Sequence, residues 1–93
     1  MYKEEESVTQ SLSIKLFASL RQAMNSDEIK IKITNKTTVS QMKKIIFETF
    51  PNLKKLNIPF IVAVNHKYAT DSIVINTDDE IALIPPVSGG ELS

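Results

Sequence analysis

The 93-residue chain has no cysteine and no tryptophan, and it has only two glycines and one histidine. Without cysteine it can form no disulfide, no thiol nucleophile and no thiolate metal site. Its lone histidine, His66, cannot by itself make a convincing zinc site. A Ser-His-Asp triad would depend on the same residue, and the sequence around His66 suggests neither a nucleophile elbow nor an orienting carboxylate. Because a glycine-rich phosphate loop is also missing, a self-contained enzyme is disfavoured.

Net charge and long apolar runs are lacking as well. Eleven basic residues balance eleven acidic ones, so no bulk charge directs the chain to nucleic acid or anionic lipid. The longest apolar runs, at 60–64 and 81–84, are far shorter than the roughly 20 residues that span a bilayer. Residues 1–7 are acidic and do not resemble a secretory signal. We expect one cytoplasmic domain with no nucleic-acid or membrane partner.

The pattern of apolar residues predicts an α+β domain over residues 12–87, with a polar mobile leader over 1–11 and a flexible tail over 88–93. Strands are predicted at 12–17, 29–33, 60–64, 73–75 and 80–84, a short helix at 18–25 and a longer helix at 39–50. Only the longer helix can cover a sheet face. The other face keeps surplus apolar residues, which is typical of a partner surface unless the leader or tail folds back over it.

The longer helix has a clear start and end. Thr38 and Gln41 have the spacing of a capping box. Pro51 ends the helix, because proline lacks an N–H and its ring clashes with the preceding turn. The predicted core stripe consists of Val39, Met42, Ile45, Ile46 and Phe50.

Strand phase separates covered residues from exposed ones. Phe17 and Ile84 fall out of phase with the apolar residues of their strands. The strand at 60–64 is apolar in both phases and is expected to be covered on both faces or nearly so. Lys30 and Lys32 alternate with isoleucines and suit a strand near a sheet edge, where charge discourages edge-to-edge pairing. No aromatic residues are interleaved with these lysines, as single-stranded nucleic acid would require.

The two glycines, Gly89 and Gly90, lie together near the C-terminus behind Pro85 and Pro86. Glycine has no Cβ, so this segment is thin enough to enter a channel that excludes side chains. The prolines end the last strand and hold the chain extended. The alternative is a disordered end without function. A diproline in front of the only glycines favours a functional tail.

Three segments resemble the MoaD family, the small, ubiquitin-like sulfur-carrier subunit of molybdopterin synthase within the ThiS/MoaD superfamily. They are Leu-Phe-Ala-Ser-Leu-Arg at 16–21, Val-Ala-Val-Asn at 62–65, and Ile-Ala-Leu-Ile-Pro-Pro-Val-Ser-Gly-Gly at 81–90. The resemblance covers about residues 12–90. It implies a β-grasp fold, in which one main helix packs across one face of a mixed sheet.

The resemblance also implies a carrier that has no activity alone and binds no cofactor. An adenylating enzyme of the ubiquitin-activating type would use ATP to activate the Gly90 carboxylate, and a sulfur donor would convert the adenylate to a thiocarboxylate. The loaded tail, with Gly89 beside Gly90, would deliver sulfur to a pterin precursor in the large catalytic subunit. Partner contacts are implied for Phe17, Tyr68, Ile84, Pro85, Pro86 and Val87.

Residues 91–93 depart from the family pattern, in which the chain ends at the glycine pair. Gly90 has no carboxylate to adenylate while it is in a peptide bond. The Ser93 carboxylate lies up to roughly 10 Å further along an extended chain. A misplacement of about 1 Å can already cost on the order of a hundredfold in rate. We therefore predict that a protease removes residues 91–93; the alternative is a chain that is never loaded.

Three other functions stay open. The chain could carry sulfur for thiamine, cysteine or another metabolite. It could be a ubiquitin-like modifier joined to lysines through Gly90, which covalent adducts would reveal. It could also be a non-catalytic β-grasp interaction module, in which Gly90 can be changed without consequence.

Overall fold

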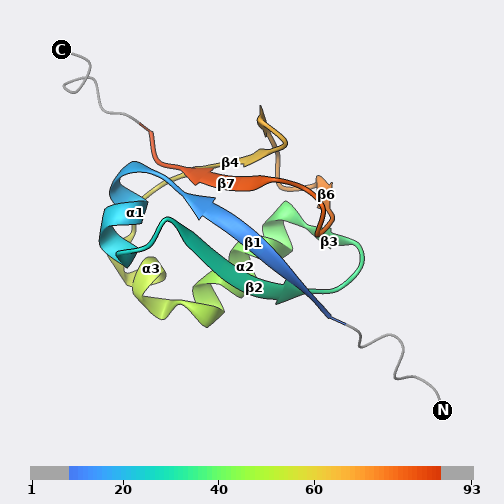
Figure 1. The fold of residues 1–93 in the computed structure, drawn as a ribbon, viewed down its shortest axis with the longest axis horizontal. Coiled ribbons are helices and arrows are strands. Elements are labelled where there is room, and N and C mark those ends of the chain that lie inside the picture. Colours follow the sequence, from blue (N-terminus) through green and yellow to red (C-terminus); the bar gives the residue numbers. More distant parts are fainter. Residues whose placement is uncertain (1–8, 87–93) are drawn as a thin grey trace.

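The computed structural model describes residues 9–86 (Figure 1). Its elements in chain order are β1 (Gln10–Leu16), α1 (Ala18–Met24), β2 (Glu28–Ile33), β3 (Thr37–Thr38), α2 (Val39–Thr49), α3 (Pro51–Leu56), β4 (Ile61–Val64), β5 (Lys67–Tyr68), β6 (Val74–Ile75) and β7 (Ile81–Ile84). Five strands form one sheet in the order β2-β1-β7-β4-β5, and β3 pairs with β6. Since β1 and β7 are parallel and the other pairs antiparallel, the sheet is mixed, and the predicted β-grasp class is confirmed.

The helix α2 forms where the capping pattern predicts it. The Gln41 N–H donates to Thr38 Oγ1 at 3.2 Å, and the Thr38 N–H donates to Gln41 Oε1 at 2.9 Å. Both halves of the capping box are therefore present. Of the predicted stripe, Val39, Met42 and Ile46 are buried. The other two members, Ile45 and Phe50, are partly buried against the core.

The core lies between this helical layer and one face of the sheet. It consists of Leu12, Ile14, Leu16, Leu20, Ile29, Ile31, Ile33, Val39, Met42, Ile46, Leu53, Val62, Ile75, Ile81 and Leu83. In Figure 1, β7 lies in the middle of the sheet between β1 and β4, and β2 forms one edge. Within residues 9–86, no helix covers the opposite face of the sheet, which we call the open face (Figure 1).

Three local predictions differ from the structure. The strand β1 begins at Gln10, inside the predicted leader, because Gln10 and Ser11 pair with β2. Both residues are polar, so the apolar alternation that identified the strand does not extend to them. Pro51 does end α2, but it also begins α3, since its fixed φ and missing N–H suit the first position of a helix. The expectation that 60–64 is covered on both faces is wrong. Ile61 is 40% exposed because it points to the open face.

Candidate functional site

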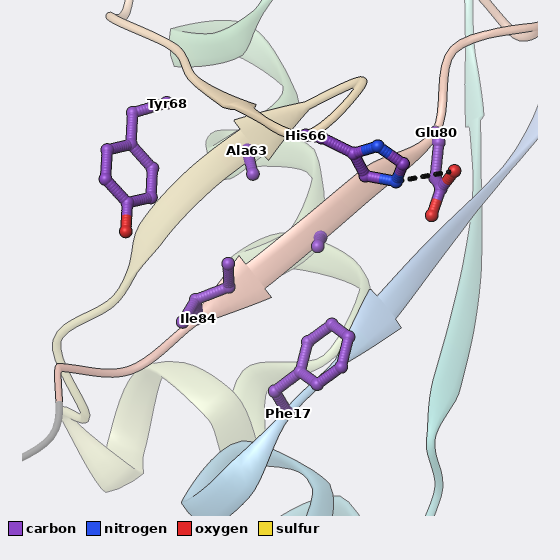
Figure 2. Close-up of a pocket in the computed structure, with 7 residues that line it drawn as sticks. Phe17, Ala63, His66, Tyr68, Glu80 and Ile84 are labelled. Atoms are coloured by element: carbon purple, nitrogen blue, oxygen red, sulfur yellow. Dashed lines mark ion pairs between the residues drawn. The ribbon is translucent and has the colours of Figure 1, made fainter.

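The carboxyl ends of two parallel strands bring Phe17 and Ile84 together on the open face. Leu16 of β1 is in register with Leu83 of β7, so the residues that follow lie side by side. Phe17 ends the strand and caps α1, with its carbonyl accepting hydrogen bonds from the Leu20 and Arg21 N–H groups. Its ring is held on the outside of the sheet and is 44% exposed. Figure 2 shows both side chains on the same side of β7.

A tight hairpin brings Tyr68 to the same face. Asn65 and His66 connect β4 to β5 with φ values of 53° and 71°, the two positive angles that a type I′ turn requires. This turn pairs Tyr68 with Ala63, and Ala63 pairs in turn with Ala82 of β7. Directly opposed residues share a face of the sheet, so these three side chains form a row across β5, β4 and β7.

The two alanines of this row leave a hollow of about 360 Å³. Its lining residues are Phe17, Ala63, His66, Tyr68, Glu80, Ala82 and Ile84 (Figure 2). The two alanines form the floor, and larger apolar side chains stand around them. Tyr68 is 74% exposed, so most of its ring is available for contact. The structure thus brings together three residues that the resemblance implies as partner contacts: Phe17, Tyr68 and Ile84.

The remaining predicted site residues lie at or beyond the end of β7. Pro85 is buried and Pro86 is exposed, so Pro86 is the one that presents surface. Val87, Gly89 and Gly90 lie outside the described residues. Sequence analysis missed Ala63 and Ala82 as site residues. Their strand phase, shared with Ile84, is the signal that could have found them.

A charged rim closes one end of the hollow. Glu80 Oε1 lies 3.2 Å from His66 Nε2, and Lys15 Nζ donates to Glu80 Oε2 at 3.3 Å. The expectation that no carboxylate lies near His66 is therefore wrong. The Asn65 N–H donates to the Glu80 carbonyl at 2.8 Å, which ties the turn to the start of β7. The lining residues include no serine or threonine, so this pair has no nucleophile in the hollow.

The rim lowers the pKa of Glu80 below its usual value of 4.5, mainly through the hydrogen bond from Lys15 and then the one from His66. A carboxyl with a lowered folded-state pKa stabilises the fold above its unfolded pKa and loses that contribution as the pH falls through the folded pKa. We expect Glu80→Gln to lower the urea midpoint slightly at neutral pH, and the difference from wild type to vanish well below pH 4.5. Glu48→Gln, at an exposed position on α2, is the control. A difference for Glu80→Gln that persists in acid would contradict the assignment.

The described residues thus form a largely apolar hollow with a charged rim. Within residues 9–86, no group of three or more histidine and acidic side chains could hold a metal ion. The same part of the chain contains no helix with the length and apolarity to cross a membrane.

Residues 14–90 match the ThiS family. The chain belongs to this family. It is 33% identical over 90 residues to a molybdopterin synthase sulfur carrier subunit of Arabidopsis thaliana, covering 95% of this chain and 94% of the relative. The crystal structure of SAMP1 from Haloferax volcanii superposes with a TM-score of 0.75 at 27% identity, covering 87% of this chain and 100% of that one. A complex of subunits 1 and 2 of molybdopterin-converting factor from Helicobacter pylori shares the fold, with a TM-score of 0.61 at 20% identity over 87% of this chain and 100% of that one.

Proposed function

We propose that the chain is a sulfur carrier for the synthesis of molybdopterin. The observation that carries this proposal is the 33% identity, over nearly the whole length of both chains, to a molybdopterin synthase sulfur carrier subunit. The chemistry of the site agrees with it, since the hollow offers contact surface and no nucleophile. The reacting atom is then the C-terminal carboxyl of Gly90, and partner proteins supply the acids, bases and charges.

The carboxylate must be activated because it is a poor electrophile. An adenylating enzyme of the ubiquitin-activating type joins the Gly90 carboxylate to the AMP portion of ATP and releases pyrophosphate. A sulfur donor then displaces AMP and leaves a thiocarboxylate. The adenylation step requires a free carboxylate at Gly90, so a protease first removes residues 91–93. The carrier is proposed to meet these partners in the cytoplasm.

The hollow serves to dock the carrier on the large catalytic subunit of molybdopterin synthase. Phe17, Tyr68 and Ile84 contact that subunit, and Ile84 is also the last residue of β7 before the tail. Gly90 follows six residues later, which allows a reach of up to roughly 20 Å in an extended chain. One docking surface can therefore hold the carrier while the narrow glycine tip enters an active site at that distance.

The intact mass of the protein purified from its own cells tests the proposal. We expect a chain that ends at Gly90 and has one oxygen replaced by sulfur. A chain that keeps residues 91–93 and carries no sulfur, in cells that are making molybdopterin, would contradict it. If substitution of Gly90 then had no effect on molybdopterin synthesis, a non-catalytic interaction module would be favoured.

The likeness to SAMP1 favours a second function, that of a protein modifier. The name SAMP1 stands for small archaeal modifier protein 1, as the solution structure of the Methanosarcina acetivorans protein states. In this case the activated Gly90 would form isopeptide bonds with lysines of other proteins. Trypsin leaves residues 68–90 of this chain as one peptide, because no lysine or arginine lies between Lys67 and Gly90. Branched peptides in which this segment is joined through Gly90 to a lysine of another protein, lost when Gly90 is deleted, would identify a modifier. If such conjugates are absent and the thiocarboxylate is present, only the carrier function is supported.

A further inference from the structure

Two lysines of the edge strand β2 lie on the same face as the hollow. The alternating residues Ile29, Ile31 and Ile33 are buried against the helices, so Glu28, Lys30 and Lys32 project from the open face. Glu28 lies beside Lys15 of β1, at the start of β2, and the two lysines follow it along the strand. The register places Lys30 beside Ser13 and Lys32 beside Ser11, both on β1. Serine side chains are short, and both lysines are exposed to solvent. We refer to Lys30 and Lys32 as the lysine strip.

The open face is therefore divided into two halves. The hollow covers β7, β4 and β5, and the lysine strip covers the edge formed by β2. The strand β1 separates the strip from β7, which gives a sideways offset of two strand spacings, or about 10 Å. Because Glu28 and Lys15 are level with Ala82, Lys30 and Lys32 are also displaced along the strand direction, by two and four residues. In Figure 1 this order runs across the sheet from β4 through β7 and β1 to β2.

The strip has no acidic partner within the described part of the chain. The ion pairs found there are formed by Lys15, Lys43 and His66. Glu80 is occupied by Lys15 and His66 at the border of the hollow. A partner that covers the hollow would extend over the strip and bring the two ammonium groups out of bulk water. Such groups need carboxylates opposite them, because a buried unpaired charge opposes binding.

Edge protection explains why charge is useful on β2, but either sign of charge would serve that purpose. Two positive charges on one side of an apolar hollow favour a single docking orientation, because a partner with carboxylates on one side can pair them in only one way. Single-stranded nucleic acid fits less well. The exposed rings of Phe17 and Tyr68 lie around the hollow and are not interleaved with the lysines.

We propose that the protein that fills the hollow presents carboxylates roughly 12 to 17 Å from its contact with the floor of the hollow, and that Lys30 and Lys32 bind them. This inference rests on the proposed function and names the chemistry of the partner. The large catalytic subunit should carry an apolar side chain flanked by an acidic segment. Exposed charges act mainly on the rate of association and on its salt dependence.

The test uses carrier ending at Gly90 and the large catalytic subunit from the same cells, with association rates measured by stopped flow. We expect the double variant Lys30→Glu/Lys32→Glu to associate more slowly by on the order of ten- to hundredfold. Raising the salt from about 50 mM to about 500 mM should slow the wild type and not the variant. The control is Lys54→Glu/Lys55→Glu, which makes the same charge change on α3 on the helical side and should leave the rate near that of wild type.

The outcomes separate the strip from the function. Equal rates for both double variants, with sulfur loading intact, would overturn the inference and leave the carrier function standing. A wild type that neither loads sulfur nor binds the large subunit would overturn both. Self-association of the wild type, or binding of a single-stranded oligonucleotide, that only the strip variant loses would assign the lysines to another occupant and also overturn the inference.

Discussion

A chain that ends at Gly90 should be adenylated, whereas the chain that retains residues 91–93 should not. The three extra residues move the terminal carboxylate by up to roughly 10 Å, and reacting groups need to be placed within a fraction of that distance. We expect the longer chain to react at least a hundredfold more slowly. Exchange of labelled pyrophosphate into ATP, catalysed by the adenylating enzyme with each chain as substrate, measures the difference.

The matched control for this prediction is a chain that ends at Gly89. It keeps a glycine carboxylate but withdraws it by about 3.5 Å, so it should also be a poor substrate. If the three chains reacted at similar rates, the enzyme would not be reading the position of the carboxylate, and trimming would not be required. Docking of the folded domain is unaffected by these changes, because the hollow is formed by residues before the tail.

The scarcity of glycine in this chain has a structural explanation. Asn25 and Asn57 end α1 and α3 in the left-handed conformation, where glycine is the usual residue. Asn65 takes the first position of the β4–β5 turn with φ of 53°. Asparagine tolerates these angles better than most residues with a side chain. The other positive φ angles of residues 9–86 are taken by Ala18, Lys36 and His66. Because residues other than glycine adopt all of these angles, the turns do not account for Gly89 and Gly90.

Local patterns predicted the parts of the fold that depend on local order. Alternation identified β1, β2 and β7, and the capping pattern located the start of α2. The same phase argument singled out Phe17 and Ile84. The helix α3 was missed because its six residues expose all but Leu53, which leaves no stripe to detect. The strand β3 was missed because its two residues carry no period, whereas β6 lies within the strand predicted at 73–75.

The hollow itself was beyond sequence reasoning because it depends on strand order. Ala63 and Ala82 become neighbours only when β4 pairs with β7. The contact between His66 and Glu80 likewise requires the turn after β4 to lie against the start of β7. The strip required the same information, since alternation shows that Lys30 and Lys32 share a face but not that the hollow lies on it.

Filling the hollow should prevent docking without disturbing the fold. Ala82→Leu adds a branched side chain to the floor between Phe17 and Ile84. Because Ala82 points to the open face, the added atoms do not enter the core. A partner side chain that occupies the floor would be displaced, a loss comparable to removing a central interface contact. We expect the Kd for the large catalytic subunit to rise about 30-fold or more, measured by calorimetry with carrier ending at Gly90.

The control is Ala23→Leu, which makes the same chemical change at an exposed position on α1 that does not line the hollow. Both variants should unfold at a urea concentration close to that of wild type, so a difference in Kd between them reports docking alone. Equal affinities for the two variants would show that the large subunit does not use the hollow. The carrier would then have to be held by its tail, and the clustering of Phe17, Tyr68 and Ile84 would need another partner.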